Sequence, residues 1–357
     1  MKFNIYLFAI TMELSLSCVS FGVPLYARSL GATDALIGVI GSGFGLSYIF
    51  SALISHRITG RRNPRNILGL LALLYAIISG VYVLVEKPAA FFFIRFVEGF
   101  TLGLFWPLAD SIPSWFAERK PGYMRNYNAG WSTAVVVAPL LSGYLSMFYG
   151  LRSVFLLGLA FAFTEAVVVF LTMPVHLAVH ETERPKSTGF GYVRPAFVNA
   201  YVTGTLLTLY PAWLNQTGFG YESIGILVGV MGFTRTVSFL LEHRIYQHLG
   251  ERTMSTGYAL CALFALVPFA KGFLLQLFVM AGVGVGMGLL FHEGLNLALE
   301  PAGKVLGNTS VFETALGTGF FFGPVVAGAV SVFGPFLIFP ETAMVSLVQL
   351  VPIARRG

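Results

Sequence analysis

Twelve apolar segments, each about 20 residues long, follow one another along the chain with little polar sequence between them. A helix of that length crosses the hydrocarbon core of a bilayer, and it satisfies its own backbone hydrogen bonds where lipid offers no partner. The composition agrees, because only 11% of the residues are charged and the mean hydropathy is +0.78. The sequence therefore predicts an all-α integral membrane protein with twelve transmembrane helices, at 4–27, 34–56, 66–86, 89–113, 126–149, 152–173, 192–215, 222–243, 253–271, 273–299, 307–332 and 334–353.

The Lys and Arg residues are divided unequally between the two ends of these segments. With the N-terminus in the cytoplasm, sixteen of the 22 basic side chains fall on the cytoplasmic side and four on the outer side. Basic residues accumulate in cytoplasmic loops, so we predict a multi-pass protein of the cell membrane with cytoplasmic N- and C-termini. The net charge of +6 then faces the anionic inner leaflet, which explains it better than nucleic-acid binding does.

The two halves of the chain repeat one another. The pentapeptide ISHRI at 54–58 returns as LEHRI at 241–245, an offset of 187. Further matches at this offset join Pro24 to Pro211, Gly31 to Gly218, Ile37 to Ile224, Gly38 to Gly225 and Gly45 to Gly232; at an offset of 185, Gly99 matches Gly284, Gly103 matches Gly288, Pro139 matches Pro324 and Gly143 matches Gly328. Six spans per copy make the repeats parallel, with a central cavity between them near the bilayer midplane. We predict six-helix bundles at 1–173 and 192–357 and a cytoplasmic linker at 174–191.

Three stretches combine spaced glycines, prolines and basic residues. The loop after the second span reads SHRITGRRNPRN, the fourth span reads IRFVEGFTLGLFWP with Arg95, Gly99 and Gly103, and the fifth reads GWSTAVVVAPLLSGYL with Pro139 and Gly143. These stretches resemble signatures of the major facilitator superfamily, and together with the repeat the resemblance extends over essentially the whole chain.

The resemblance implies a secondary transporter that works by alternating access, with a cytoplasmic gate in the loop after the second span. The gate residues would be His56, Arg57, Arg61 and Arg62, with His56 where the superfamily usually has an acid. The antiporter signature of the fifth span is half present, because three of its usual glycine positions are occupied by Ala134, Ala138 and Ser142.

Charged side chains inside the spans are the candidates for proton coupling, because an ionisable group facing lipid costs roughly 3 kcal/mol or more. The resemblance implies that spans 1, 4, 7 and 10 line the cavity, which selects Glu13, Arg95 and Glu98. Burial disfavours a charged carboxyl and a nearby guanidinium favours it, so we predict Glu13 as the proton-binding site and Arg95 as the charge that modulates it. Arg95 and Glu98 share one helix face and could instead form a static structural pair. Asp110, Glu165 and Glu313 also lie within spans but have no assigned coupling role.

Aromatic and polar residues on these spans are the candidates for substrate binding. As a group they suit an organic solute with apolar surface, oriented by a few polar groups. His292 could equally pack by a hydrogen bond, and Arg235 could pair with Glu242. The predicted substrate-binding residues are Trp106, Asn199, Tyr201, Tyr210, Trp213, Arg235, Phe291 and His292.

Three functions remain open from the sequence. The first is proton-coupled export of amphipathic or cationic compounds, and the second is an uptake carrier, symporter or uniporter, for a polar metabolite such as a sugar or carboxylate. The third is an enzyme or receptor on a transporter-like scaffold, but the chain has no GxSxG or HExxH motif, so we expect no enzyme and no metal. It also lacks a GxxxxGK[ST] loop, so we expect no nucleotide cofactor. The expected partners are a small-molecule substrate, protons and the lipid bilayer, and a monomer can enclose the whole path.

Overall fold

The protein is all-helical in the part of the chain that the computed structural model describes, which comprises residues 3–59, 62–116, 122–174, 190–250, 252–299 and 305–351. Within these ranges, nine helices have the length and apolar composition to cross a membrane. The elements in order are α1 (Ile5–Ser29), α2 (Asp34–Thr59), α3 (Pro64–Tyr82), α4 (Ala90–Phe116), α5 (Tyr123–Tyr149), α6 (Arg152–Thr172), η1 (Phe190–Tyr192), α7 (Val193–Gln216), α8 (Tyr221–Leu249), α9 (Arg252–Cys261), η2 (Ala262–Phe269), α10 (Phe273–Leu299), α11 (Val305–Val330), η3 (Pro335–Leu337) and α12 (Ile338–Val348).

The predicted fold class is confirmed, with two predicted spans built differently from a single α-helix. The ninth consists of the ten-residue α9 followed by the eight-residue 3-10 helix η2, which contains Pro268. At about 1.5 Å per α-helical and 2.0 Å per 3-10 residue, the two pieces cover about 31 Å, close to the thickness of a bilayer core. The twelfth span consists of η3 and the eleven-residue α12.

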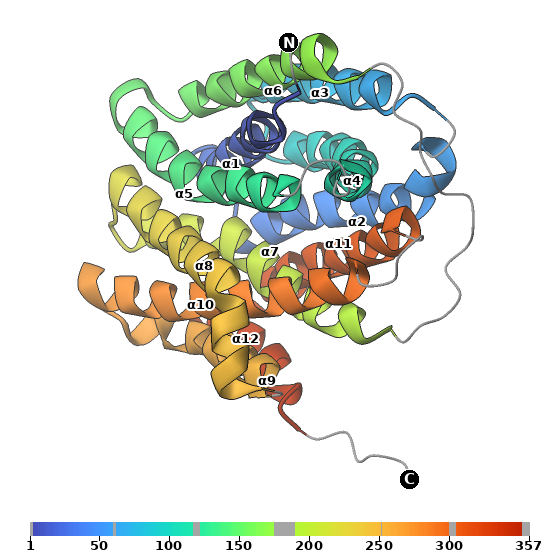
Figure 1. The fold of residues 1–357 in the computed structure, drawn as a ribbon. Helices are drawn as coiled ribbons and strands as arrows, with labels where there is room; N and C mark the ends of the chain where they lie inside the picture. Colours follow the sequence, from blue (N-terminus) through green and yellow to red (C-terminus); the bar gives the residue numbers. More distant parts are fainter. Residues whose placement is uncertain are drawn as a thin grey trace.

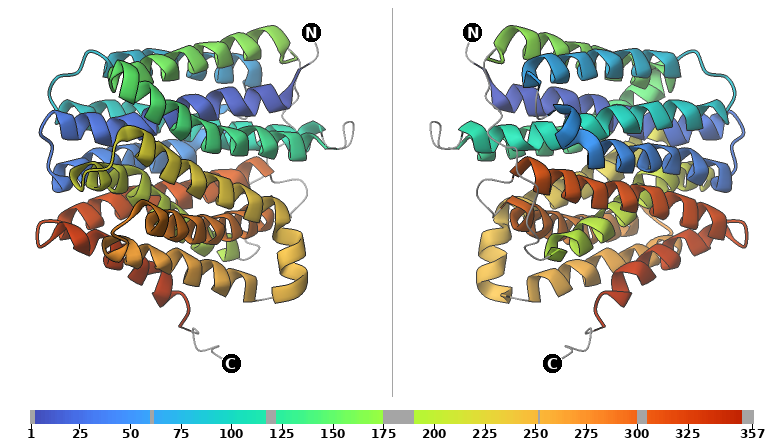
Figure 2. Two further views of the ribbon diagram at one scale, coloured as in Figure 1. Left: turned by 90° about the vertical axis from the view of Figure 1, so that its left-hand side faces the viewer. Right: turned by 90° about the vertical axis from the view of Figure 1, so that its right-hand side faces the viewer.

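The first six helices and the last six occupy opposite sides of the bundle (Figure 1). Helices α2 and α11 pack together across the boundary, as do α5 and α8. The side views show the helices running roughly parallel to one direction (Figure 2). Large apolar side chains on the outer surface, such as Phe93, Phe278 and Phe333, are at least 70% exposed, as expected for groups that face lipid.

Glycines at matching positions of the two repeats hold both boundaries close. A methyl group added to Gly38 on α2 would lie 2.8 Å from the Cα of Gly328 on α11. One added to Gly225 on α8 would lie 3.1 Å from the Cα of Gly143 on α5. Each contact is the repeat-related copy of the other, so the duplicated glycines explain why the two interfaces are alike.

The ends of α1 and α7 repeat one another in the same way. Gly31 and Gly218 both adopt a left-handed backbone, with φ of 89° and 95°, a conformation that costs glycine nothing. The following amide of Ala32 donates to the carbonyl of Ala27 at 3.0 Å, and at the offset of 187 the amide of Phe219 donates to Leu214 at 3.1 Å. The repeat therefore extends to the hydrogen bonds that end its helices.

Candidate functional site: a charged cavity between the halves

A cavity of about 180 Å³ lies between the two halves. It is somewhat larger than an engineered apolar cavity of about 150 Å³ that holds a benzene molecule. Its walls come from α1, α2, α4 and α5 on one side and from α7, α8, α10 and α11 on the other. The lining is mostly apolar, and the charged residues in it are Glu13, Arg95, Asp110, Arg235 and Glu313.

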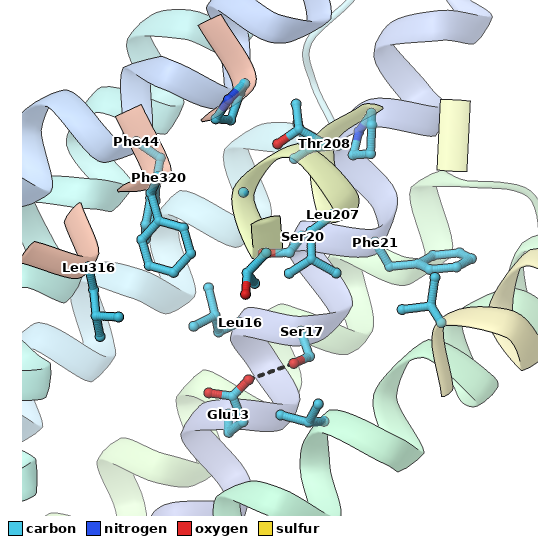
Figure 3. Close-up of a pocket in the computed structure, with 18 of the residues that line it drawn as sticks. Glu13, Leu16, Ser17, Ser20, Phe21, Phe44, Leu207, Thr208, Leu316 and Phe320 are labelled. Atoms are coloured by element: carbon cyan, nitrogen blue, oxygen red, sulfur yellow. Dashed lines mark hydrogen bonds between the residues drawn. The ribbon is translucent and has the colours of Figure 1, made fainter. Parts of the chain in front are cut away.

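Glu13 lies on α1 and faces this cavity (Figure 3). Its carboxylate accepts a hydrogen bond of 2.6 Å from the hydroxyl of Ser17, one turn further along the same helix. The side chain is partly exposed, and the opposite wall carries Phe44 and Phe320. A carboxyl held only by its own helix can change partners without moving another helix.

Arg235 reaches the cavity from α8, on the other half of the protein. Its guanidinium carbon lies 5.0 Å from the ring centroid of Phe291 and 5.8 Å from that of Trp131, within the range of cation–π attraction. Glu13 and Arg235 are close enough to influence each other electrostatically. They do not form one of the ion pairs within 4.0 Å found among the described residues.

Arg95 and Glu98 form a closed network inside the first half. Their side chains pair at 2.7 Å, and Glu98 is fully buried. The hydroxyls of Tyr75 and Tyr82 on α3 donate to its carboxylate at 3.0 and 2.6 Å. Arg95 lines the cavity and lies over the ring of Phe44 at 4.6 Å, whereas Glu98 is not part of the lining. These contacts have the form of the static structural pair.

Two further acids in the lining, Asp110 on α4 and Glu313 on α11, belong to opposite halves. The two carboxyls are close enough to influence each other electrostatically. Tyr127 donates to Asp110, and Tyr48 donates to Glu313 across the α2–α11 boundary. Sequence reasoning found both acids as intramembrane ionisable groups but had no signal that would pair residues 203 positions apart.

The predicted substrate-binding residues divide into two groups. Trp106, Arg235 and Phe291 line the cavity. The others are not part of its lining and pack within the second half: Tyr201 donates to Glu341, Tyr210 donates to Gln276 at 3.1 Å, Trp213 packs on Phe339, His292 packs edge-on against Phe239, and Asn199 is buried.

The predicted gate residues lie at the end of the bundle where α1 begins and α2 ends. Arg57 and Arg62 are exposed there, and His56 is partly buried. Arg61 lies outside the described residues. Nearby, the hydroxyls of Ser55 on α2 and Ser310 on α11 lie 2.9 Å apart, so this end of the α2–α11 boundary is held by a polar contact.

A charged cavity between two repeated six-helix halves is the arrangement of an alternating-access transporter. The profile of the Major Facilitator Superfamily matches residues 5–304, and the chain belongs to that superfamily. It is therefore a membrane-embedded transporter for small molecules and not an enzyme.

Individual relatives resemble the chain over nearly its whole length. The quinolone resistance protein NorA of Staphylococcus aureus is 20% identical over 92% of this chain and 88% of its own. The multi-drug resistance efflux pump PmrA of Streptococcus pneumoniae is 25% identical over 92% of this chain and 89% of its own. Among solved structures, a mutant of the nucleoside transporter NupG superposes with a TM-score of 0.73 at 14% identity, covering 97% of both chains. The last likeness concerns the fold alone.

Proposed function

We propose that this transporter exports amphipathic or cationic organic compounds in exchange for protons. The observation that carries the proposal is Glu13, a carboxyl that faces the central cavity and whose hydrogen-bond partner, among the residues that the structure describes, lies on its own helix. Asp110 and Glu313 are fixed by tyrosines on other helices. Glu13 is therefore the acid in this lining that can bind a proton in one state and attract a cation in another.

The mostly apolar lining supports an amphipathic substrate. Phe44, Leu207, Leu316 and Phe320 form walls around the space in front of Glu13 (Figure 3). Such walls bind organic surface with little directional demand. Two relatives are by name a quinolone resistance protein and a multi-drug efflux pump, which supports export.

The proposal includes an orientation and a division of the chain. Both termini lie in the cytoplasm, Arg57 and Arg62 face it, and His56, Arg57, Arg61 and Arg62 belong to the gate on that side. The six-helix units 1–173 and 192–357 rock about the α2–α11 and α5–α8 boundaries and open the cavity to each side in turn. One proton moving inward down 100 mV supplies about 2.3 kcal/mol for this cycle.

The experiment measures ethidium movement in proteoliposomes under an imposed pH gradient, together with the proton flux. Wild type should accumulate ethidium on the side from which protons leave. In Glu13→Gln this accumulation should be lost, while exchange of labelled for unlabelled ethidium continues, because exchange needs no net proton transfer. Glu86→Gln is the matched control, since the Glu86 side chain is 81% exposed and does not belong to the cavity lining.

Two results would contradict the proposal. If Glu13→Gln keeps wild-type accumulation driven by the pH gradient, Glu13 does not couple protons. If wild type moves a sugar or a small carboxylate together with protons and ignores ethidium, the protein is an uptake carrier for a polar metabolite.

A further inference from the structure

Arg235, in the cavity wall, forms no close ion pair with any side chain in the described part of the protein. Three ion pairs occur among the described residues, and Arg235 takes part in none of them. Its Nε atom is buried and has no hydrogen-bond partner in that part of the chain. Burying an unpaired charge inside a membrane protein costs several kcal/mol. Such groups therefore usually serve a function, and for this guanidinium we look for one in the cavity.

The internal repeat shows which partner is missing. At the offset of 187, Arg235 on α8 corresponds to Tyr48 on α2. Tyr48 donates across the boundary to Glu313 on α11. At the offset of 185, the position on α5 that corresponds to Glu313 is Asn128. The second boundary therefore has a stronger donor than the first, but its acceptor is a neutral amide.

That amide is also engaged elsewhere. The Oδ1 atom of Asn128 accepts a hydrogen bond of 3.2 Å from the indole nitrogen of Trp131. Trp131 is then fixed with its ring against Phe291, at 5.4 Å between centroids. The two rings flank the guanidinium and point it at the cavity, while Glu13 stays beyond ion-pair distance. An anionic group of a molecule in the cavity could therefore bind in front of the Arg235 guanidinium.

We propose that Arg235 binds the anionic group, such as a carboxylate, of an aromatic substrate whose ring packs against the apolar walls of the cavity. A guanidinium forms paired hydrogen bonds with a carboxylate, and its aromatic neighbours keep water from competing. The inference adds aromatic compounds with an acidic group to the amphipathic and cationic compounds of the proposed function. A basic group on the same molecule would find Glu13 across the cavity. This inference rests on the proposed transport function for its physiological meaning.

The test is a binding experiment on the purified protein, without a proton gradient. Calorimetry compares 2-naphthoate with 2-naphthamide, which has the same ring and no charge. Wild type should prefer the acid. Arg235→Gln should weaken 2-naphthoate binding about 10- to 100-fold, the usual value of a hydrogen bond to a charged group, and leave 2-naphthamide unchanged. Arg235→Lys should lie between them, because it keeps the charge and loses the planar fork.

Controls separate this site from misfolding and from the coupling proposal. Arg125→Gln, at an exposed arginine, should bind both compounds as wild type does. Unchanged 2-naphthamide binding shows that Arg235→Gln is folded. Equal affinity of wild type for acid and amide, or an equal loss of both in Arg235→Gln, would overturn the inference. Selective acid binding in a protein that shows no proton-linked transport would keep the inference and remove the proposed function instead.

Discussion

The buried pair of Arg95 and Glu98 permits a prediction that separates a structural role from a coupling role. Glu98→Gln keeps an oxygen acceptor for one of Tyr75 and Tyr82, presents an amide NH2 to the other, and leaves the guanidinium of Arg95 without its anion. Removing one partner of a buried ion pair costs about 3 to 5 kcal/mol, whereas replacing both partners by neutral groups is often close to neutral. Glu98→Gln should therefore be less stable than the double variant Arg95→Met/Glu98→Gln.

The size of the effect follows from the length of the chain. An unfolding entropy of about 2.1 cal/mol/K per residue gives about 0.75 kcal/mol/K for 357 residues. A loss of about 4 kcal/mol then lowers the melting temperature by about 5 °C. The double variant should lie within about 2 °C of wild type, since its cost is on the order of 1 kcal/mol. The coupling energy between the two sites should be at least about 2 kcal/mol.

The assay is thermal unfolding of the four proteins of this cycle in one detergent. The exposed pair of Arg152 and Glu86 is the control cycle, because its atoms lie 3.9 Å apart and the side chains are 52% and 81% exposed. The coupling energy measured in that control cycle should be less than about 1 kcal/mol. The reasoning is wrong if Glu98→Gln has the same melting temperature as wild type. If the same variant also loses proton-linked transport, Glu98 carries a proton and the static pair is excluded.

Three further predictions concern the boundaries between the halves. Gly45→Val on α2 places its side chain against the backbone of Phe321 on α11, so it should lower stability by about 1 to 3 kcal/mol and abolish transport. Gly272 has open space around it, so the control Gly272→Ala should change neither the melting temperature nor transport. Tyr48→Phe removes the hydroxyl that donates to Glu313 and should lower stability by about 1 to 3 kcal/mol in thermal melts. Asp110 and Glu313 interact electrostatically between the two halves, so Glu313→Gln, which removes one of the two acids, should change how the melting temperature depends on pH; a profile parallel to that of wild type would contradict this.

The sequence was sufficient for the fold because its constraints are local or repeated. Segment length and hydropathy predict the spans, and the matches at fixed offsets predict two parallel halves. The ninth span, α9 with η2, could not be foreseen in detail, because an apolar segment can cross the membrane as one α-helix or in two pieces. Its length in ångströms is preserved even though its hydrogen bonding is not.

The candidate site was less accessible from sequence, because it depends on which side chains meet across helices. Spacing of three correctly placed Arg95 and Glu98 on one face, and the structure joins them. It could not show that two tyrosines of α3 close this network. Tyr201 and Tyr210 were assigned to the substrate from their helix alone, but a helix has several faces, and the structure directs them to Glu341 and Gln276.

The two halves agree where backbones touch and differ where charges lie. Gly38 and Gly225 make the same contact twice, because the absence of a side chain lets the paired helices approach closely at both boundaries. The charges have no such duplication: Glu13 corresponds to Ala200 at the offset of 187, and Arg235 corresponds to Tyr48. A cavity with two copies of each charge would bind its ligands in two related positions and would lose a fixed ratio of protons to substrate. Under the proposed cycle, Glu13 on one half and Arg235 on the other, each without a copy in the opposite half, would allow one proton and one oriented molecule per cycle.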